Sequence, residues 1–275
     1  MSAEEPRAGE AFYHVRVKQG DVARYVLLPG DPERVPLIAE LWDEGWELSS
    51  HREFKVWSGR VNGRLISACS TGVGASSASI AVEELARAGS DTFIRVGSSG
   101  AIQPEINLGD LVISAAAVRL EGASRDYALP EYPACASYEV LLALIEAAES
   151  LNVRYHVGVT ATTDSFYLGQ GRRGCRGYEW SRSKRLIKDL KAMRVLNIEM
   201  ETAAIYTLAS LYGLRAGAVC AVFANRIRDE FEVVGEREAA RVAVEAVKIL
   251  QEWDELKAKQ GKPLIYPSLL MEWKG

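Results

Sequence analysis

Apolar and polar residues follow two different spacings along this chain, one typical of strands and the other of helices. Short apolar runs predict buried strands at residues 24–29, 93–96, 110–118, 155–163 and 215–223, and the run 93–96 breaks into a turn at Gly97-Ser98-Ser99-Gly100. Alternating residues predict a hairpin within 46–70, with strands at 53–61 and 64–70 joined at Asn62-Gly63. Apolar residues at helical spacing predict helices at 33–41, 75–88, 137–151, 182–193, 197–211 and 235–259. Residues 119–136 are rich in turn-forming residues and predict a loop.

The order of these elements predicts the fold class. Strands alternate with helices over most of the chain, which is typical of an α/β protein with a mixed, largely parallel central sheet and helices on both faces. No linker or shift in composition divides the 275 residues. We therefore expect a single domain.

Composition and charge narrow the class of protein. The formal net charge of −4 argues against a nucleic-acid-binding surface that relies on a broad excess of basic residues. No apolar run is long enough to span a bilayer, and the first residues lack the apolar core of a signal peptide. The four cysteines are scattered without metal-ligand spacing. These features favour a reduced cytoplasmic protein and leave disulfides open.

Polar clusters follow several of the predicted strands. They are Gly30-Asp31, Gly97-Ser98-Ser99, the segment 164–172, and Asn225-Arg226. In open α/β sheets, ligands bind beyond the carboxyl ends of strands, so these clusters predict one site. Arg95 lies inside an apolar strand, where an unpaired charge is costly, and a glycine turn that can cradle an anion follows it.

Other polar residues have more than one interpretation before any relative is considered. The segment 164–173 begins with Phe166 and Tyr167 and continues with basic residues, which fits a mobile lid, a pocket wall or a surface loop. Glu199 and Glu201 precede an apolar helix, where acidic residues commonly complement the helix dipole. A single histidine such as His14 is more often structural than catalytic.

Six motifs occur in the order found in the nucleoside phosphorylase-I family. They are Gly30-Asp31-Pro32-x-Arg34, Ser50-His51-Arg52-Glu53-Phe54, Ser70-Thr71-Gly72-x-Gly74, Arg95-x-Gly97-x-x-Gly100-Ala101, Phe166-Tyr167-x-Gly169-Gln170-x-Arg172 and Glu199-Met200-Glu201. Between about residues 12 and 252 the sequence resembles that family, most closely its members that cleave uridine. The polar residues 1–11 predict a flexible N-terminus, the resemblance implies a phosphorylase domain at 12–252, and residues 253–275 form a C-terminal extension beyond it.

This resemblance implies the reversible reaction of uridine and phosphate to give uracil and ribose 1-phosphate, a step of pyrimidine salvage. The implied phosphate ligands are Gly30, Arg34, Arg52, Arg95 and Ser98. The implied ribose ligands are His14, Ser98, Glu199, Met200 and Glu201. The implied base ligands are Phe166, Gln170, Arg172 and Arg226. Arg95, Arg172 and Glu201 are the implied catalytic residues, with phosphate itself as the nucleophile.

The resemblance also implies how the protein is assembled and what it needs. We expect a homo-oligomer, a hexamer built as a trimer of dimers, in which His14 and Arg52 complete a neighbour's site. Inorganic phosphate is the co-substrate, and neither an organic cofactor nor a metal is expected. Some relatives hold a monovalent cation through the glutamate that matches Glu53, and for this chain the sequence leaves that question open.

Three alternatives remain at this point. A purine nucleoside or methylthioadenosine phosphorylase would carry Ser-Asp where this chain has Ala224-Asn225, and asparagine has no proton to give a purine N7. A nucleoside-binding protein without turnover, or a nucleosidase that uses water, would not need the phosphate arginines.

The sequence departs from the family pattern at two places. Ser98 replaces the usual threonine, and Phe223-Ala224 replaces a more aliphatic pair. Activity on thymidine or deoxyuridine stays open.

Overall fold

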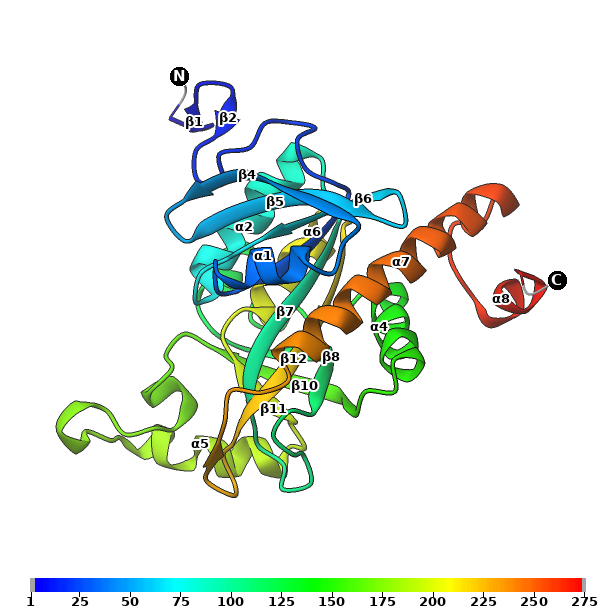
Figure 1. The fold of residues 1–275 in the computed structure, drawn as a ribbon. Helices are drawn as coiled ribbons and strands as arrows, with labels where there is room; N and C mark the ends of the chain where they lie inside the picture. The colour runs from blue at the N-terminus through cyan, green and yellow to red at the C-terminus, as the bar shows by residue number, and fades with distance from the viewer. Residues whose placement is uncertain (1–2, 274–275) are drawn as a thin grey trace.

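A large mixed sheet with helices on both faces forms the body of the protein (Figure 1). The computed structural model describes residues 3–273. In that range eleven strands join this sheet: β3 (Tyr25–Pro29), β4 (Glu44–His51), β5 (Phe54–Val61), β6 (Arg64–Cys69), β7 (Thr92–Ala101), β8 (Leu111–Leu120), β9 (Ala134–Cys135), β10 (Tyr155–Thr163), β11 (Asn197–Glu199), β12 (Arg215–Asn225) and β13 (Glu230–Phe231). The helices are α1 (Arg34–Ala39), α2 (Ala75–Ala88), α3 (Ala123–Tyr127), α4 (Tyr138–Ser150), α5 (Ser181–Ala192), α6 (Thr202–Leu211), α7 (Glu236–Gln260) and α8 (Pro267–Trp273). The predicted α/β class is confirmed.

Five strands of this sheet close into a ring. β7 pairs in parallel with β12, and β12 pairs antiparallel with β8. β8 pairs in parallel with β10, β10 in parallel with β11, and β11 antiparallel with the end of β7. β3, β6, β5 and β4 extend from β7 as an open wing. Because β3, β7 and β12 are parallel, their carboxyl ends meet at one edge, and ring closure brings β11 against it.

The two faces of the sheet are covered by different helices, as the alternation of residues in β3 dictates. Tyr25 and Leu27 belong to the core beneath α1, α4 and α7. Val26 and Leu28 point the other way, into the core beneath α2 and α6. Both faces are buried, which explains why the central strands are continuous apolar runs.

Four local predictions are wrong. The stretch Gly97-Ser98-Ser99-Gly100, predicted as a turn, continues strand β7 and pairs with β12. Residues 44–51 form β4, an additional strand paired with β5. Residues 197–199 form β11, and helix α6 begins only at Thr202. The segment 119–136, predicted as a loop, contains α3 and the short strand β9. Each missed element has five or fewer residues or lies at an exposed edge, so it shows little hydrophobic periodicity.

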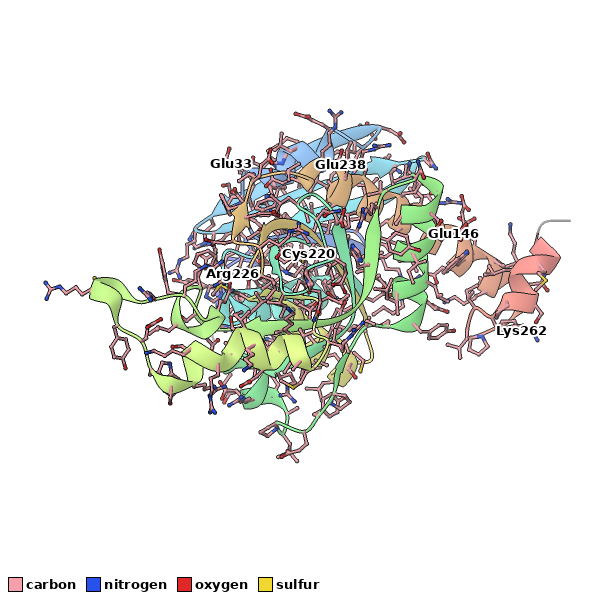
Figure 2. All side chains as sticks on the ribbon, turned by 90° about the horizontal axis from the view of Figure 1, so that it is seen from below. Glu33, Glu146, Cys220, Arg226, Glu238 and Lys262 are labelled. Carbon is pink, nitrogen blue, oxygen red and sulfur yellow. The ribbon has the colours of Figure 1, made fainter. Side chains whose placement is uncertain are left out.

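The ends of the described chain form small elements of their own. Strands β1 (Arg7–Ala8) and β2 (Ala11–Phe12) pair with each other near the N-terminus. After α7 the chain turns back, and Leu269 of α8, together with Ile265 before that helix, packs against Leu256. Figures 1 and 2 show α8 projecting on the side opposite the segment that precedes α5. None of the helices in residues 3–273 is long and apolar enough to cross a membrane.

Candidate active site

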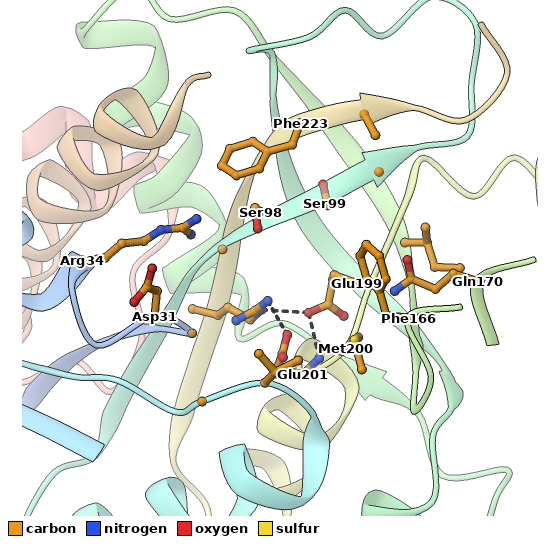
Figure 3. Close-up of a pocket in the computed structure, with 18 of the residues that line it drawn as sticks. Asp31, Arg34, Ser98, Ser99, Phe166, Gln170, Glu199, Met200, Glu201 and Phe223 are labelled. Atoms are coloured by element: carbon orange, nitrogen blue, oxygen red, sulfur yellow. Dashed lines mark hydrogen bonds and ion pairs between the residues drawn. The ribbon is translucent and has the colours of Figure 1, made fainter. Parts of the chain in front are cut away.

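A cavity of about 460 Å³ opens where β3, β7 and β12 end and β11 enters the sheet (Figure 3). Its walls contain most of the residues implied by the motifs, drawn from segments far apart in the sequence. The implied residues that line it are Gly30, Arg34, Arg95, Ser98, Phe166, Gln170, Arg172, Glu199, Met200 and Glu201. Three implied residues do not line it: His14, Arg52 and Arg226.

Arg95 lies in the cavity wall between two carboxylates. Its Nε donates a hydrogen bond of 2.8 Å to Glu199 Oε2, and its Nη2 forms an ion pair with Glu201. All three side chains are 5 % exposed or less. Its Nη1 is buried and has no hydrogen-bond partner among the described residues. Leaving a buried N–H group without a hydrogen bond costs free energy, so this atom is available to donate a hydrogen bond to a ligand in the cavity.

Gly97 makes room for this arginine. A Cβ at position 97 would lie 2.9 Å from the Arg95 Cζ atom and 2.8 Å from the Cys220 sulfur. Real Cβ atoms do not approach neighbours so closely, so any larger residue would push the guanidinium out of place. The glycine that follows Arg95 in the motif therefore has a packing reason.

The carboxylate of Glu199 forms its hydrogen bonds with groups of the protein itself. It accepts hydrogen bonds from Thr162 Oγ1 at 2.6 Å and from the backbone N–H groups of Glu201 and Thr202 at 2.9 and 3.0 Å. Burial alone would raise its pKa, but the charge of Arg95 and these hydrogen bonds hold the pKa of Glu199 below its ordinary value. This carboxylate stays ionised and fixes both Arg95 and the first turn of α6.

Glu201 has the opposite electrostatic character. Its Oε1 accepts a hydrogen bond of 2.6 Å from the backbone N–H of Gly74. Burial raises the pKa of Glu201 to about 7, because burial, together with the nearby charge of Glu199, outweighs the lowering effect of the Arg95 charge. Two carboxylates thus share one guanidinium, and Glu201 is the one that gains a proton near neutral pH.

Arg34 brings a second guanidinium to the same end of the cavity. It forms an ion pair with Glu236, the first residue of α7, and its Cζ lies 5.4 Å from the centre of the Phe223 ring. Figure 3 shows the Arg34 guanidinium directed toward Ser98 and Phe223. Phe223, which departs from the family pattern, therefore contacts the arginine through its ring face.

The other end of the cavity is built around Gln170 and Arg172. Arg172 Nη1 donates to the Gln170 side-chain oxygen and to the Phe166 carbonyl, each at 2.6 Å, and its guanidinium stacks 3.8 Å from the centre of the Phe166 ring. Arg226 donates from behind to the Gln170 carbonyl at 2.9 Å. Burial, aided by the charge of Arg226, lowers the pKa of Arg172 to about 10. Its hydrogen-bond acceptors here are neutral oxygens, so an anion is favoured at this end.

Both ends of the Asn225 side-chain amide form hydrogen bonds with backbone groups. Its Nδ2 donates to the carbonyls of Gln103 and Ile106 at 3.0 and 2.8 Å. Its Oδ1 accepts from the N–H groups of Ile227 and Arg228 at 2.9 and 3.0 Å. The side chain is 0 % exposed and holds the turn after β12. It is committed to structure and does not line the cavity.

Asn225→Asp is expected to destabilise the fold by about 2–4 kcal/mol, because a carboxylate oxygen would face two carbonyl oxygens instead of donating to them. The same change is not expected to create purine-cleaving activity. Urea unfolding and an inosine assay measure the two effects. Asn152→Asp, at an exposed turn, is the matched control and should be neutral. An Asn225→Asp protein of normal stability that cleaves inosine would contradict the assignment.

His14 and Arg52 form a cluster of their own around Tyr13. The His14 ring lies edge-on to the Tyr13 ring at 4.9 Å, and the Arg52 guanidinium lies 5.8 Å from the centre of that ring. The Nδ1 atom of His51 lies 3.1 Å from the His14 carbonyl oxygen. Within one copy of the chain this cluster is separate from the cavity lining.

Some residues at the site carried no clear sequence signal. Phe231 lines the cavity from β13 although it is 72 % exposed, and an apolar residue in a polar turn is its only sign. Ser99, by contrast, belongs to the predicted cluster Gly97-Ser98-Ser99 and lines the cavity, but its hydroxyl accepts a hydrogen bond of 2.9 Å from Asn197. Glu53, which matches the cation-holding glutamate of some relatives, does not line the cavity, and its carboxylate accepts a hydrogen bond of 2.9 Å from Ser77. Residues 3–273 contain no group of three or more His, Cys, Asp or Glu side chains able to hold a metal ion.

The sequence matches the family model of the phosphorylase superfamily over residues 24–251, and the chain belongs to that superfamily. It is 62 % identical over 270 residues to the uridine phosphorylase of Thermococcus kodakarensis, which covers 98 % of each chain. It is 44 % identical over 246 residues to the uridine phosphorylase of Salmonella typhimurium, covering 86 % of this chain and 97 % of the relative. A guanosine phosphorylase of Halorubrum lacusprofundi is 39 % identical over 214 residues, covering 78 % and 83 %.

Proposed function

We propose that this protein is a uridine phosphorylase, a pentosyltransferase that converts uridine and phosphate to uracil and ribose 1-phosphate. One observation carries the proposal: a single cavity is lined by the guanidinium groups of Arg34 and Arg95, by that of Arg172 at its other end, and by the buried carboxylates of Glu199 and Glu201. The high identity to uridine phosphorylases over nearly the whole chain supports it. The same activity in a cell belongs to pyrimidine salvage, in the cytoplasm.

Phosphate binds at the end formed by Gly30, Arg34, Arg95 and Ser98. The open Nη1 donor of Arg95 and the second guanidinium of Arg34 suit a dianion, since arginine offers several fixed N–H groups. A phosphate oxygen forms a bond to ribose C1′ as the bond from C1′ to the uracil nitrogen breaks. The electron pair of that bond leaves with the base.

Ribose lies between the two ends. Glu201 and the Met200 backbone hold its hydroxyls, with the carboxylate close to the positive charge that develops on the sugar. Glu199, whose oxygens are already bonded, contributes beside them by fixing Arg95 and the start of α6.

Uracil lies against Phe166 with its polar edge toward Gln170 and Arg172. Because the Gln170 oxygen already accepts from Arg172, its amide N–H group is the part directed outward, toward a carbonyl of the base. Arg172 stabilises the negative charge on the leaving base, and Arg226 holds Gln170 from behind. Asn225 offers no acid for a purine nitrogen, which favours a pyrimidine.

His14 and Arg52 serve the site of a neighbouring copy. Their separation from the cavity of their own chain supports this arrangement. The active form is then a homo-oligomer, a hexamer built as a trimer of dimers, and a stable monomer would be inactive. Phosphate is the co-substrate, and the cation that some relatives hold is left to experiment.

Base release from uridine, thymidine, inosine and methylthioadenosine, with and without phosphate, tests the proposal. Uridine cleavage that depends on phosphate is the expected result. Phosphate-independent cleavage would indicate a nucleosidase, and inosine or methylthioadenosine outrunning uridine would indicate a purine enzyme. Binding of uridine without turnover would indicate a nucleoside-binding protein. The 39 % identity to a guanosine phosphorylase makes a guanosine arm worthwhile.

A further inference from the structure

A buried carboxylate on α2 is the main partner of His14. Glu84 accepts a hydrogen bond of 2.7 Å from the His14 ring Nδ1. It also accepts from the backbone N–H groups of His14 and Val15, at 2.9 and 2.8 Å. The Glu84 side chain is 11 % exposed, and that of His14 is 23 % exposed. One carboxylate thus holds both the ring and the chain that carries it.

Helix packing does not account for Glu84. Its neighbours on the buried face of α2 are apolar or small, among them Ala81, Val82 and Leu85, each 0 % exposed. A carboxylate in such surroundings is costly unless every oxygen is bonded. Glu84 meets that condition only through the segment that contains His14, so its one evident consequence is the placement of that residue.

The contact also fixes the chemistry of the His14 ring. A carboxylate only accepts hydrogen bonds, so Nδ1 must carry a proton to donate to it. In the neutral ring the lone pair then lies on Nε2, which becomes a hydrogen-bond acceptor. The rings of Tyr13 and Phe54, at 4.9 and 6.1 Å, stand edge-on to the imidazole and restrict its rotation.

We propose that Glu84 is a positioning residue for catalysis. It holds His14 as the Nδ1–H tautomer, so that Nε2 accepts a hydrogen bond from a ribose hydroxyl of uridine bound to a neighbouring copy of this chain. The inference rests on the proposed function and adds a residue and a hydrogen-bond direction to it. The ligand group must therefore be a donor, which a sugar hydroxyl is.

Glu84→Gln tests this with little change of shape. The glutamine oxygen can still accept from the two backbone N–H groups, but its amide nitrogen cannot accept from Nδ1–H, so the ring must change tautomer. We expect kcat/KM for uridine to fall on the order of tenfold. The control is Glu83→Gln, whose carboxylate instead bonds Tyr212 and Arg87. It should leave kcat/KM unchanged.

A double-mutant cycle separates positioning from a merely structural role. If Glu84 acts through His14, then Glu84→Gln has no further effect on kcat/KM in a His14→Ala protein. Deoxyuridines lacking the 2′, 3′ or 5′ hydroxyl in turn give a second readout, because the effect of Glu84→Gln should vanish with one of them. An equal loss in both backgrounds and with every analogue would overturn the proposal.

The tautomer can be read in the wild-type protein, which keeps the test valid if the variant fails to fold. The chain has three histidines, so nitrogen NMR of the imidazoles can be assigned with few variants. Protonated Nδ1 with bare Nε2 on His14 supports the proposal, and protonated Nε2, in either the neutral or the charged ring, overturns it. A wild-type protein that does not cleave uridine would refute the proposed function instead, whatever the tautomer.

Discussion

Arg95→Ala is expected to reduce kcat/KM for phosphate by about 10²–10³-fold, the usual loss for one preorganised donor at a developing or bound anion. The reason lies in its geometry. Two of its nitrogen atoms are held by Glu199 and Glu201, which leaves buried Nη1 as a rigid donor for phosphate. Initial rates at varied phosphate and saturating uridine measure the effect.

The same substitution also threatens the fold. Removing Arg95 leaves two buried carboxylates without their shared cation, which costs about 3–5 kcal/mol. Arg95→Met combined with Glu199→Gln removes one charge of each sign and should regain much of that stability while still failing to use phosphate. Normal phosphate KM and normal kcat in this folded double variant would contradict the assigned role.

Arg215→Met provides the matched control. Arg215 is another largely buried arginine, paired with Asp254 at 2.7 Å and Glu139 at 3.2 Å. That network joins β12 to α4 and α7 and does not line the cavity. Its loss should lower the unfolding temperature without changing the KM for phosphate. Only the Arg95 variants should show both effects.

The site residues that could be predicted are those that lie in chemically suggestive motifs and whose motifs occur in the order of a known family. A glycine turn after a strand, an arginine in an apolar strand and a Glu-x-Glu pair each have weak meaning alone, but their fixed order identifies the family. Ten of the site residues that the family implies line the cavity. The faces of β3 were also predictable, because an apolar strand covered on both sides shows no polar alternation.

What could not be predicted depends on contacts between distant segments. Ring closure requires β11, a three-residue strand whose pairing with β7 and β10 leaves no periodic pattern. The position of Glu199 follows from that strand, so its internal hydrogen bonds were hidden as well. Asn225 and Glu84 are single polar residues, and the carbonyls to which Asn225 donates and the His14 segment that binds Glu84 lie far along the chain. Their roles are visible only once the fold joins them.

Glu201→Gln is expected to affect activity and stability in opposite directions. The amide keeps the shape and one acceptor, for either Gly74 N–H or Arg95 Nη2, but loses the negative charge next to the ribose. We expect kcat/KM for uridine to fall about 10²–10³-fold. Since Glu199 remains to pair with Arg95, the buried cluster then carries no excess charge.

The stability change has a defined pH dependence. The pKa of Glu201 rises from 4.5 to about 7 on folding, so the folded state binds its proton more tightly than the unfolded state. Stability from this group is full below pH 4.5 and is lost as the pH rises to about 7. Glu201→Gln has no such loss, so its advantage over wild type should grow between pH 5 and 7 and then level off, at up to about 3 kcal/mol. Urea unfolding of both proteins at pH 5, 6, 7 and 8 measures it. An advantage that does not grow between pH 5 and 7 would mean that Arg95 dominates and that Glu201 is ionised throughout, and the proton would then play no part in the site.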